Sequence, residues 1–190
     1  MRNEPKYNDI LDFISTYGAI TNEICTNLFY NTKYGKDCSR RALNKLHDKK
    51  IIRKGIDVIN NTYQYYLTRT ISNHKLQLLR FYSYVVKAGA EILDFQKEYK
   101  SIKAISDGFM MYRYNGKTKI IVIETDITKK TKVKKYENLY EEGYFQEKYG
   151  TFPRVFILDA NPSLRKRRMK SDKVKFEFLN FAFDGIESIL

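Results

Sequence analysis

The sequence predicts a mixed α and β protein of two domains, and three observations carry this prediction. Up to about residue 70, apolar residues first recur at helical spacing and then alternate as in a hairpin. Beyond about residue 90, apolar strands are interspersed with helical stretches, as in an α/β domain. Asn115-Gly116 stands between two apolar runs, which is the strongest short signal for a two-residue hairpin. We therefore expect domains at 1–72 and 73–190.

The first domain is expected to contain three helices followed by a two-stranded hairpin. Apolar residues at helical intervals predict a first helix that ends at Gly18. Thr21 precedes a second amphipathic stretch and is expected to begin the second helix. The third helix covers 36–50, and the two strands are expected at 51–55 and 61–68.

The third helix separates an apolar face from a basic one. Within 36–54 there are eight Lys or Arg against two Asp. Two helices, a basic third helix and a ribbon form the winged helix-turn-helix pattern, whose third helix can enter the major groove of DNA. The expected DNA contacts on this helix and the ribbon are Arg40, Arg41, Asn44, Lys45, Lys49, Arg53 and Lys54. The alternative is a solvated basic face on a winged helix that binds protein.

The second domain is expected to be a small α/β domain. Its predicted elements are a linking helix at about 74–88, a strand near 90–95, the hairpin at 106–126, a helix at about 130–149, and strands at 154–159 and 174–183. Both faces of the hairpin are apolar apart from its acidic end. Such strands belong in the middle of a sheet that is covered on both sides.

Three carboxylates gather at the acidic end of this hairpin. Folding the chain at Asn115-Gly116 places Asp107 opposite Glu124, with Asp126 two residues further along the same face. Like charges directly opposed across two strands are destabilising unless a cation or a shared proton relieves them. The pattern therefore predicts a metal site or the remains of one.

The acidic hairpin resembles the PD-(D/E)XK nuclease core, in which an Asp, a turn and a Glu-x-Lys hold Mg²⁺ and position the attacking water. Here Ser106-Asp107 and Glu124-Thr125-Asp126 stand at the motif positions, so the motif Lys is replaced by Asp126. The resemblance implies Asp107, Glu124 and Asp126 as Mg²⁺ ligands and catalytic groups, with Lys132 or Lys135 supplying the cation from the next helix. The missing Lys favours a degenerate core and a binding protein over an enzyme, and a Mg²⁺-dependent nuclease or nickase is the alternative.

The whole arrangement is similar to the replication-relaxation family of plasmids and mobile elements. The matching positions are Asp107, Gly108, Glu124, Asp126, Thr128, Lys132, Val133 and Tyr136. The resemblance implies an α+β protein with an N-terminal winged helix and a PD-(D/E)XK-like domain. It also implies binding of double-stranded DNA in replication, conjugative transfer or transcriptional control. With 16 tyrosines in the chain, Tyr136 and Tyr140 are expected to pack rather than to act as nucleophiles.

The charge of the chain agrees with a polyanionic partner. The 190 residues carry a net charge of +13, and basic clusters at 129–135 and 165–175 are placed to meet a duplex backbone. No apolar run approaches a membrane span, and two cysteines are too few for a disulfide framework, so we expect a cytoplasmic protein without a membrane partner. A third interpretation makes the second domain a platform for a homodimer or for replication or transfer machinery.

Overall fold

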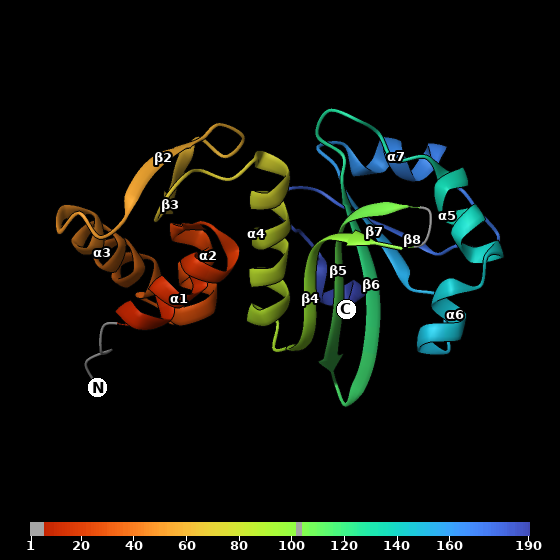
Figure 1. Ribbon diagram of the computed structural model, residues 1–190, viewed down its shortest axis with the longest axis horizontal. Coiled ribbons are helices and arrows are strands. Elements are labelled where there is room, and N and C mark those ends of the chain that lie inside the picture. The colour runs from red at the N-terminus through yellow and green to blue at the C-terminus, as the bar shows by residue number, and fades with distance from the viewer. Residues whose placement is uncertain (1–5, 102–103) are drawn as a thin grey trace. The chain divides into compact units, whose positions relative to one another are not determined.

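The computed structural model describes residues 6–101 and 104–190, and the chain divides into two compact units, with the boundary between Lys87 and Ala88 (Figure 1). Both units contain helices and strands, so the predicted mixture of α and β structure is confirmed. The division differs from the predicted boundary after residue 72. The linking helix belongs to the first unit, where Asn27 Nδ2 donates to Ser83 Oγ at 3.1 Å.

The described part of the first unit contains four helices and three short strands. These are α1 (Tyr7–Tyr17), β1 (Ile20–Thr21), α2 (Asn22–Phe29), α3 (Gly35–Asp48), β2 (Arg53–Asp57), β3 (Thr62–Tyr66) and α4 (Asn73–Lys87). The strands form an antiparallel sheet in the order β1-β3-β2. The three predicted helices and the hairpin are therefore present, with ends that differ by a few residues.

Local signals in the sequence explain where these helices begin and end. The Gly18 N–H donates to Ile14 O at 2.7 Å and closes α1, as predicted. The Thr21 hydroxyl accepts a hydrogen bond from Ile24 N at 3.2 Å and caps α2. The buried residues of α3 are Gly35, Ser39, Ala42, Leu43 and Leu46, and they lie opposite its basic residues, as the helical spacing predicts. Burial of that face leaves the basic face of α3 in solvent.

The described part of the second unit contains five strands and four helices. These are β4 (Glu91–Lys100), β5 (Ile105–Tyr114), β6 (Lys117–Thr125), α5 (Val133–Glu141), α6 (Tyr144–Tyr149), β7 (Arg154–Leu158), α7 (Pro162–Arg168), β8 (Phe176–Leu179) and α8 (Ile186–Ile189). The sheet order is β4-β5-β6-β7-β8, antiparallel up to β6 and parallel from β6 to β8. The predicted hairpin therefore occupies the middle of the sheet.

The predicted register of the β5–β6 hairpin is confirmed as far as Gly108 and Ile123. Asn115 and Gly116 have φ values of 51° and 73°, as a type I′ turn requires. Tyr114 pairs with Lys117, and the pairing runs without a shift to Gly108 opposite Ile123. On one face of the sheet, β5 and β6 pack against α5 and α6 through a buried aromatic core that includes Phe109, Val122, Tyr136, Leu139 and Phe145.

Several predicted elements of the second unit differ from the observed ones. The single helix expected at 130–149 is wrong, because Gly143 adopts a left-handed φ of 72° and separates α5 from α6. The first strand runs five residues beyond its predicted end at residue 95, and the last strand, expected at 174–183, is limited to Phe176–Leu179. The basic segment after β7 is helical, with Asn161 Oδ1 accepting a hydrogen bond from Leu164 N at its start.

Candidate functional site

The solvent face of α3 carries four of the residues predicted to contact DNA. Arg40, Arg41, Asn44 and Lys45 are all exposed. Arg40 Nη2 lies 3.0 Å from Asp37 Oδ1, and both side chains of this ion pair are exposed. Exposed pairs of this kind contribute about 0–1 kcal/mol, so the guanidinium can exchange this partner for a phosphate at little cost.

Neighbouring aromatic rings support two polar side chains on this face. The Tyr65 hydroxyl donates to Asn44 Oδ1 at 3.3 Å, which holds the amide at the base of the β2–β3 hairpin. The Lys45 ammonium lies 5.6 Å from the centre of the Tyr7 ring. Cation–π contacts orient a Lys side chain without removing its charge. The face therefore presents several positive charges and one ordered amide to solvent.

The remaining predicted DNA contacts extend this face toward the β2–β3 hairpin. Lys49, Arg53 and Lys54 are exposed, and the Lys54 ammonium lies 5.0 Å from the centre of the Tyr63 ring. Asp57 closes the hairpin turn, because its carboxylate accepts from Asn60 N at 3.3 Å and from Asn60 Nδ2 at 2.7 Å. The turn is thus ordered next to the basic strand.

Two apolar side chains on the hairpin escaped the sequence analysis. Ile56 and Val58 are 65% and 74% exposed, at the end of β2 and in the turn. The sequence signal for their exposure was the alternation Ile56-Asp57-Val58, because alternate residues of a strand share a face. The structure buries Asp57 and exposes its two neighbours. These two side chains lie beside the basic residues of β2 and are open to solvent.

At the acidic end of the β5–β6 hairpin, Glu124 is the central buried carboxylate, with 6% of its surface exposed. Lys135 Nζ donates to Glu124 Oε1 at 2.5 Å, and the Tyr136 hydroxyl donates to the same oxygen. The Tyr136 hydroxyl also lies 3.0 Å from Ser106 Oγ. Asp107 Oδ2, from the facing strand, accepts a hydrogen bond from Thr125 N at 2.7 Å. The two opposed carboxylates therefore have separate donors, which reduces their repulsion.

Asp126 has a different set of partners from the other two predicted carboxylates. Its Oδ1 accepts from Thr131 N at 2.9 Å and from Thr131 Oγ1 at 2.7 Å, and its Oδ2 lies 2.5 Å from Arg165 Nη2. Lys130 Nζ bonds Asp159 Oδ2 at 2.6 Å. These residues form an ion cluster where β6 and β7 end, so the three predicted carboxylates fall into two groups.

Sequence analysis missed the role of Asp159 and Arg165 in this ion cluster. Asp159 directly follows β7, and the carboxyl ends of parallel strands meet at one edge of a sheet. That position was a usable signal for Asp159. Arg165 was assigned to a cluster facing DNA, yet its side chain is only 12% exposed and bonds both Asp126 and Thr131.

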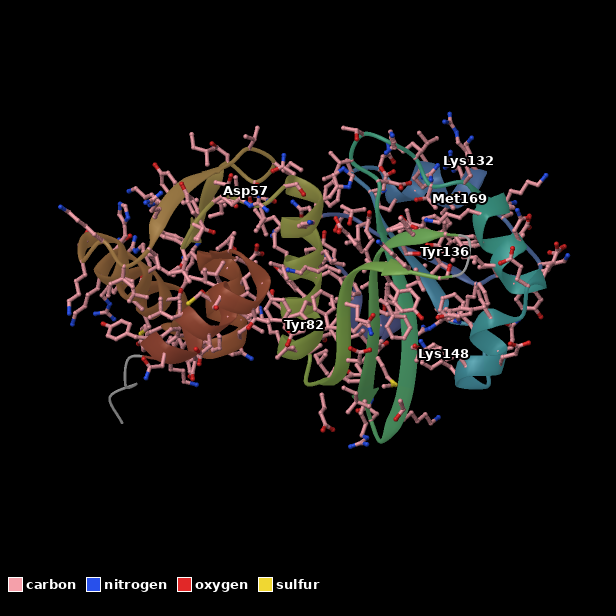
Figure 2. All side chains as sticks on the ribbon, viewed as in Figure 1. Asp57, Tyr82, Lys132, Tyr136, Lys148 and Met169 are labelled. Carbon is pink, nitrogen blue, oxygen red and sulfur yellow. The ribbon has the colours of Figure 1, made fainter. Side chains whose placement is uncertain are left out.

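The structure also distinguishes between the two lysines considered as replacements for the motif Lys. Lys135, on α5, contacts Glu124 and also donates to Ile105 O at 2.7 Å. Lys132 is exposed, and Figure 2 shows it at the rim of the unit, away from Tyr136. Of this pair, Lys135 is therefore the cation beside the acidic end of the hairpin.

Burial sets the protonation of the groups around Glu124. Burial raises the pKa of Glu124, and the charge and hydrogen bond of Lys135 oppose that rise. The pKa of Tyr136 is raised well above its ordinary value, first by complete burial and then by the neighbouring Glu124 carboxylate. Tyr136 is thus a neutral donor inside the core, in agreement with the expectation that it packs rather than acts as a nucleophile.

No group of three His, Cys, Asp or Glu side chains in the described part of the chain is placed to hold a metal ion. Asp107 and Glu124 are the two carboxylates that remain together, and Asp126 is held by Thr131 and Arg165. A Mg²⁺ ion at the acidic end of the hairpin stays a prediction.

Comparisons of the chain with protein-family models, with curated proteins and with solved structures found no match. The similarity to the replication-relaxation family therefore stays a prediction. None of the described helices is both long and apolar enough to cross a membrane.

Proposed function

We propose that the protein binds double-stranded DNA and that its first unit is a winged helix-turn-helix. In this proposal α3 enters the major groove and the β2–β3 hairpin is the wing. The observation that supports it best is the exposed basic face of α3, which continues through Lys49 into Arg53 and Lys54 on the adjoining strand. Arg and Lys on such a helix can bond guanine edges or phosphates, and Asn44 can bond adenine.

The second unit would add affinity that does not depend on DNA sequence. Residues 73–190 contain 23 Lys or Arg against 15 Asp or Glu. On α7, Lys166, Arg167 and Arg168 are exposed, whereas Arg165 points to the ion cluster. We propose a degenerate PD-(D/E)XK-like core for this unit, with a role in plasmid replication, conjugative transfer or transcriptional control. A homodimer or the replication or transfer machinery would be further partners.

The test is fluorescence anisotropy of the full chain with labelled mixed-sequence duplexes. Arg41→Ala and Lys45→Ala should each weaken binding, because each removes a positive charge from the proposed interface. Affinity should also fall steeply with salt as counterions are released. Lys117→Ala is the matched control, since it removes an exposed charge at the first residue of β6. Equal effects of all three variants, or no binding at low salt, would refute the proposal.

A second candidate function is a Mg²⁺-dependent nuclease or nickase. The contact between Lys135 and Glu124 favours it, because it brings a cation to the acidic end of a hairpin that lacks the motif Lys. The ion pair between Asp126 and Arg165 disfavours the nuclease, because the charge of this carboxylate is already balanced by a guanidinium group. We therefore expect slow cleavage or none.

Incubation with supercoiled plasmid and Mg²⁺ or Mn²⁺ separates the two functions. Nicking that disappears in both Asp107→Ala and Glu124→Ala would establish the nuclease. Lys135→Met should then abolish nicking, and Lys132→Met should retain it, because Lys132 lies in solvent.

A further inference from the structure

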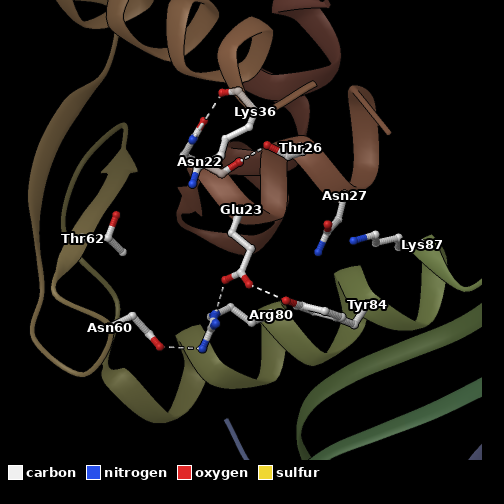
Figure 3. Close-up of a pocket in the computed structure, with 10 residues that line it drawn as sticks. All are labelled: Asn22, Glu23, Thr26, Asn27, Lys36, Asn60, Thr62, Arg80, Tyr84 and Lys87. Carbon is white, nitrogen blue, oxygen red and sulfur yellow. Dashed lines mark hydrogen bonds and ion pairs between the residues drawn. The ribbon is translucent and has the colours of Figure 1, made fainter. Parts of the chain in front are cut away.

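The first unit contains a cavity of about 470 Å³, and none of the predicted DNA contacts lines it (Figure 3). Its walls come from four elements that are distant in sequence. Glu23 and Asn27 lie on α2, Lys36 on the first turn of α3, Asn60 in the turn before β3, and Arg80 on α4. The volume falls within the range of sites that bind small molecules.

The residues that line this cavity are almost all of polar or charged types, and their carbon atoms form part of its surface. The described residues that form it include no aliphatic side chain, and Tyr84 is the one aromatic among them. Two of the polar residues are nearly inaccessible, since Asn27 is 5% and Arg80 is 6% exposed. Burial of polar groups costs free energy that an apolar lining would avoid. Partners within the first unit satisfy these two side chains, so the case for an occupant rests on the charged groups of the lining.

Glu23 and Arg80 neutralise each other inside the cavity. Arg80 Nε donates to Glu23 Oε2 at 2.6 Å, and the Tyr84 hydroxyl donates to Glu23 Oε1 at 2.6 Å. Burial would raise the pKa of Glu23, but the hydrogen bond and charge of Arg80 and the other donors lower it overall. Glu23 therefore stays ionised and balances one of the positive charges.

The lining keeps an excess of positive charge after this pairing. It contains Lys36, Arg80 and Lys87 against the single carboxylate of Glu23. The Lys87 ammonium lies 5.5 Å from the centre of the Tyr84 ring, and Figure 3 shows it directed toward Asn27. Two ammonium groups and nearby amides suit an oxyanion that also carries hydroxyl groups.

We propose that this cavity binds a small polar metabolite that carries a phosphate or carboxylate group. Lys36 and Lys87 supply the charge that attracts the anion, and the amide oxygen of Asn27 can accept a hydrogen bond from its hydroxyl groups. The site is defined by contacts within the first unit and does not depend on DNA.

The cavity also adjoins both parts of the proposed DNA interface, a consequence that rests on the proposed function. Arg80 Nη1 donates to Asn60 Oδ1 at 2.7 Å, and Asn60 bonds Asp57 in the β2–β3 turn. On the other side, Ser39 Oγ of α3 bonds Asn22 Oδ1 at 2.5 Å. An occupant would thus contact the supports of both the wing and α3, and its binding should change the affinity for DNA.

Three probes with one carbon skeleton test the site on the full chain without DNA. Glucose 6-phosphate carries a phosphate, gluconate carries a carboxylate, and glucose carries no charge. Isothermal titration calorimetry and the thermal unfolding midpoint should show binding of at least one anion at millimolar concentration and none of glucose. A response to only one anion identifies the chemical group. No binding of either anion at about 20 mM, or equal binding of glucose, would overturn the proposal.

Substitutions then place the anion in the cavity. Lys87→Gln should weaken anion binding by about 10-fold or more, since it removes a charge-assisted hydrogen bond. Lys33→Gln, an exposed residue outside the cavity, should leave it within about 2-fold. Equal affinity in the wild type and in Lys87→Gln and Lys36→Gln would overturn the assignment to this cavity. Anion binding without any DNA binding would retain the site and reject the DNA function instead.

Discussion

Replacement of Arg165 by Met should destabilise the second unit, because it removes the cation that faces a buried carboxylate. Arg165 Nη2 lies 2.5 Å from Asp126 Oδ2 and 2.8 Å from Thr131 O. Asp126 is only 2% exposed. Loss of one partner from a buried ion pair costs about 3–5 kcal/mol. Thr131 still donates twice to the other Asp126 oxygen, so we expect a loss near the lower end, about 3 kcal/mol.

Urea unfolding of the full chain, followed by tyrosine fluorescence and circular dichroism, measures this loss. With a slope of about 1.5 kcal/mol per molar urea, the transition of the second unit should move down by about 2 M. Arg167→Met is the matched control, because Arg167 is exposed on the same helix and should shift the free energy of unfolding by less than about 0.5 kcal/mol. Asp126→Asn added to Arg165→Met should recover part of the loss, since a neutral amide needs no counter-charge. Equal midpoints for Arg165→Met and Arg167→Met would refute the importance of the buried pair.

Three further predictions follow from burial and charge. Replacement of Lys166, Arg167 and Arg168 by Ser should lower the affinity for DNA about 10-fold for all sequences. Anisotropy titrations at several salt concentrations should show a smaller dependence of affinity on salt, and a loss of affinity for one sequence alone would contradict this prediction. Burial raises the pKa of Glu124 above its ordinary value of 4.5, so the stability it contributes is present below that pH and is lost as pH rises through the raised value. In urea titrations between about pH 4 and about pH 8, the free energy of unfolding of Glu124→Gln should not show this decrease with pH. Parallel curves of unfolding free energy against pH for the wild type and Glu124→Gln would contradict the prediction. Burial also raises the pKa of the Cys25 thiol to about 12, so Ellman's reagent should modify Cys38 first in the native protein, and Cys38→Ser should remove that fast phase; a fast phase that persists would contradict this.

Local signals allowed much of the fold to be predicted from the sequence. Thr21 and Gly18 mark helix ends through hydrogen bonds that their own segments make, and Asn115-Gly116 sets a register over the whole hairpin. The break at Gly143 was missed, since an isolated Gly within an amphipathic stretch also occurs inside helices. The position of α4 in the first unit depends on contacts with α2 that are 56 residues apart in sequence, which periodicity alone cannot reveal.

Local signals also predicted part of the candidate site. The face of α3 followed from the helical period, and the positions of Asp107 and Glu124 followed from the turn. Asp126 was expected to join them because alternate residues of a strand share a face. It follows the last residue of β6, and its carboxylate instead pairs with Arg165, 39 positions later in the sequence. Strand periodicity carries no information about such a partner.

The exposed turn at Asn115-Gly116 limits how the length of this chain can vary. Side chains alternate between the faces of a strand, so a change of loop length there that is not absorbed as a bulge would shift every later pair by one position. In the shifted register, Asp107 and Glu124 would no longer face each other, and the side chains of one strand would exchange faces. Substitutions at this turn can therefore be tolerated when they keep its two positive φ angles, whereas an insertion or deletion keeps the register only when the loop absorbs it. A surface position at one end of the hairpin thus constrains the chemistry at its other end.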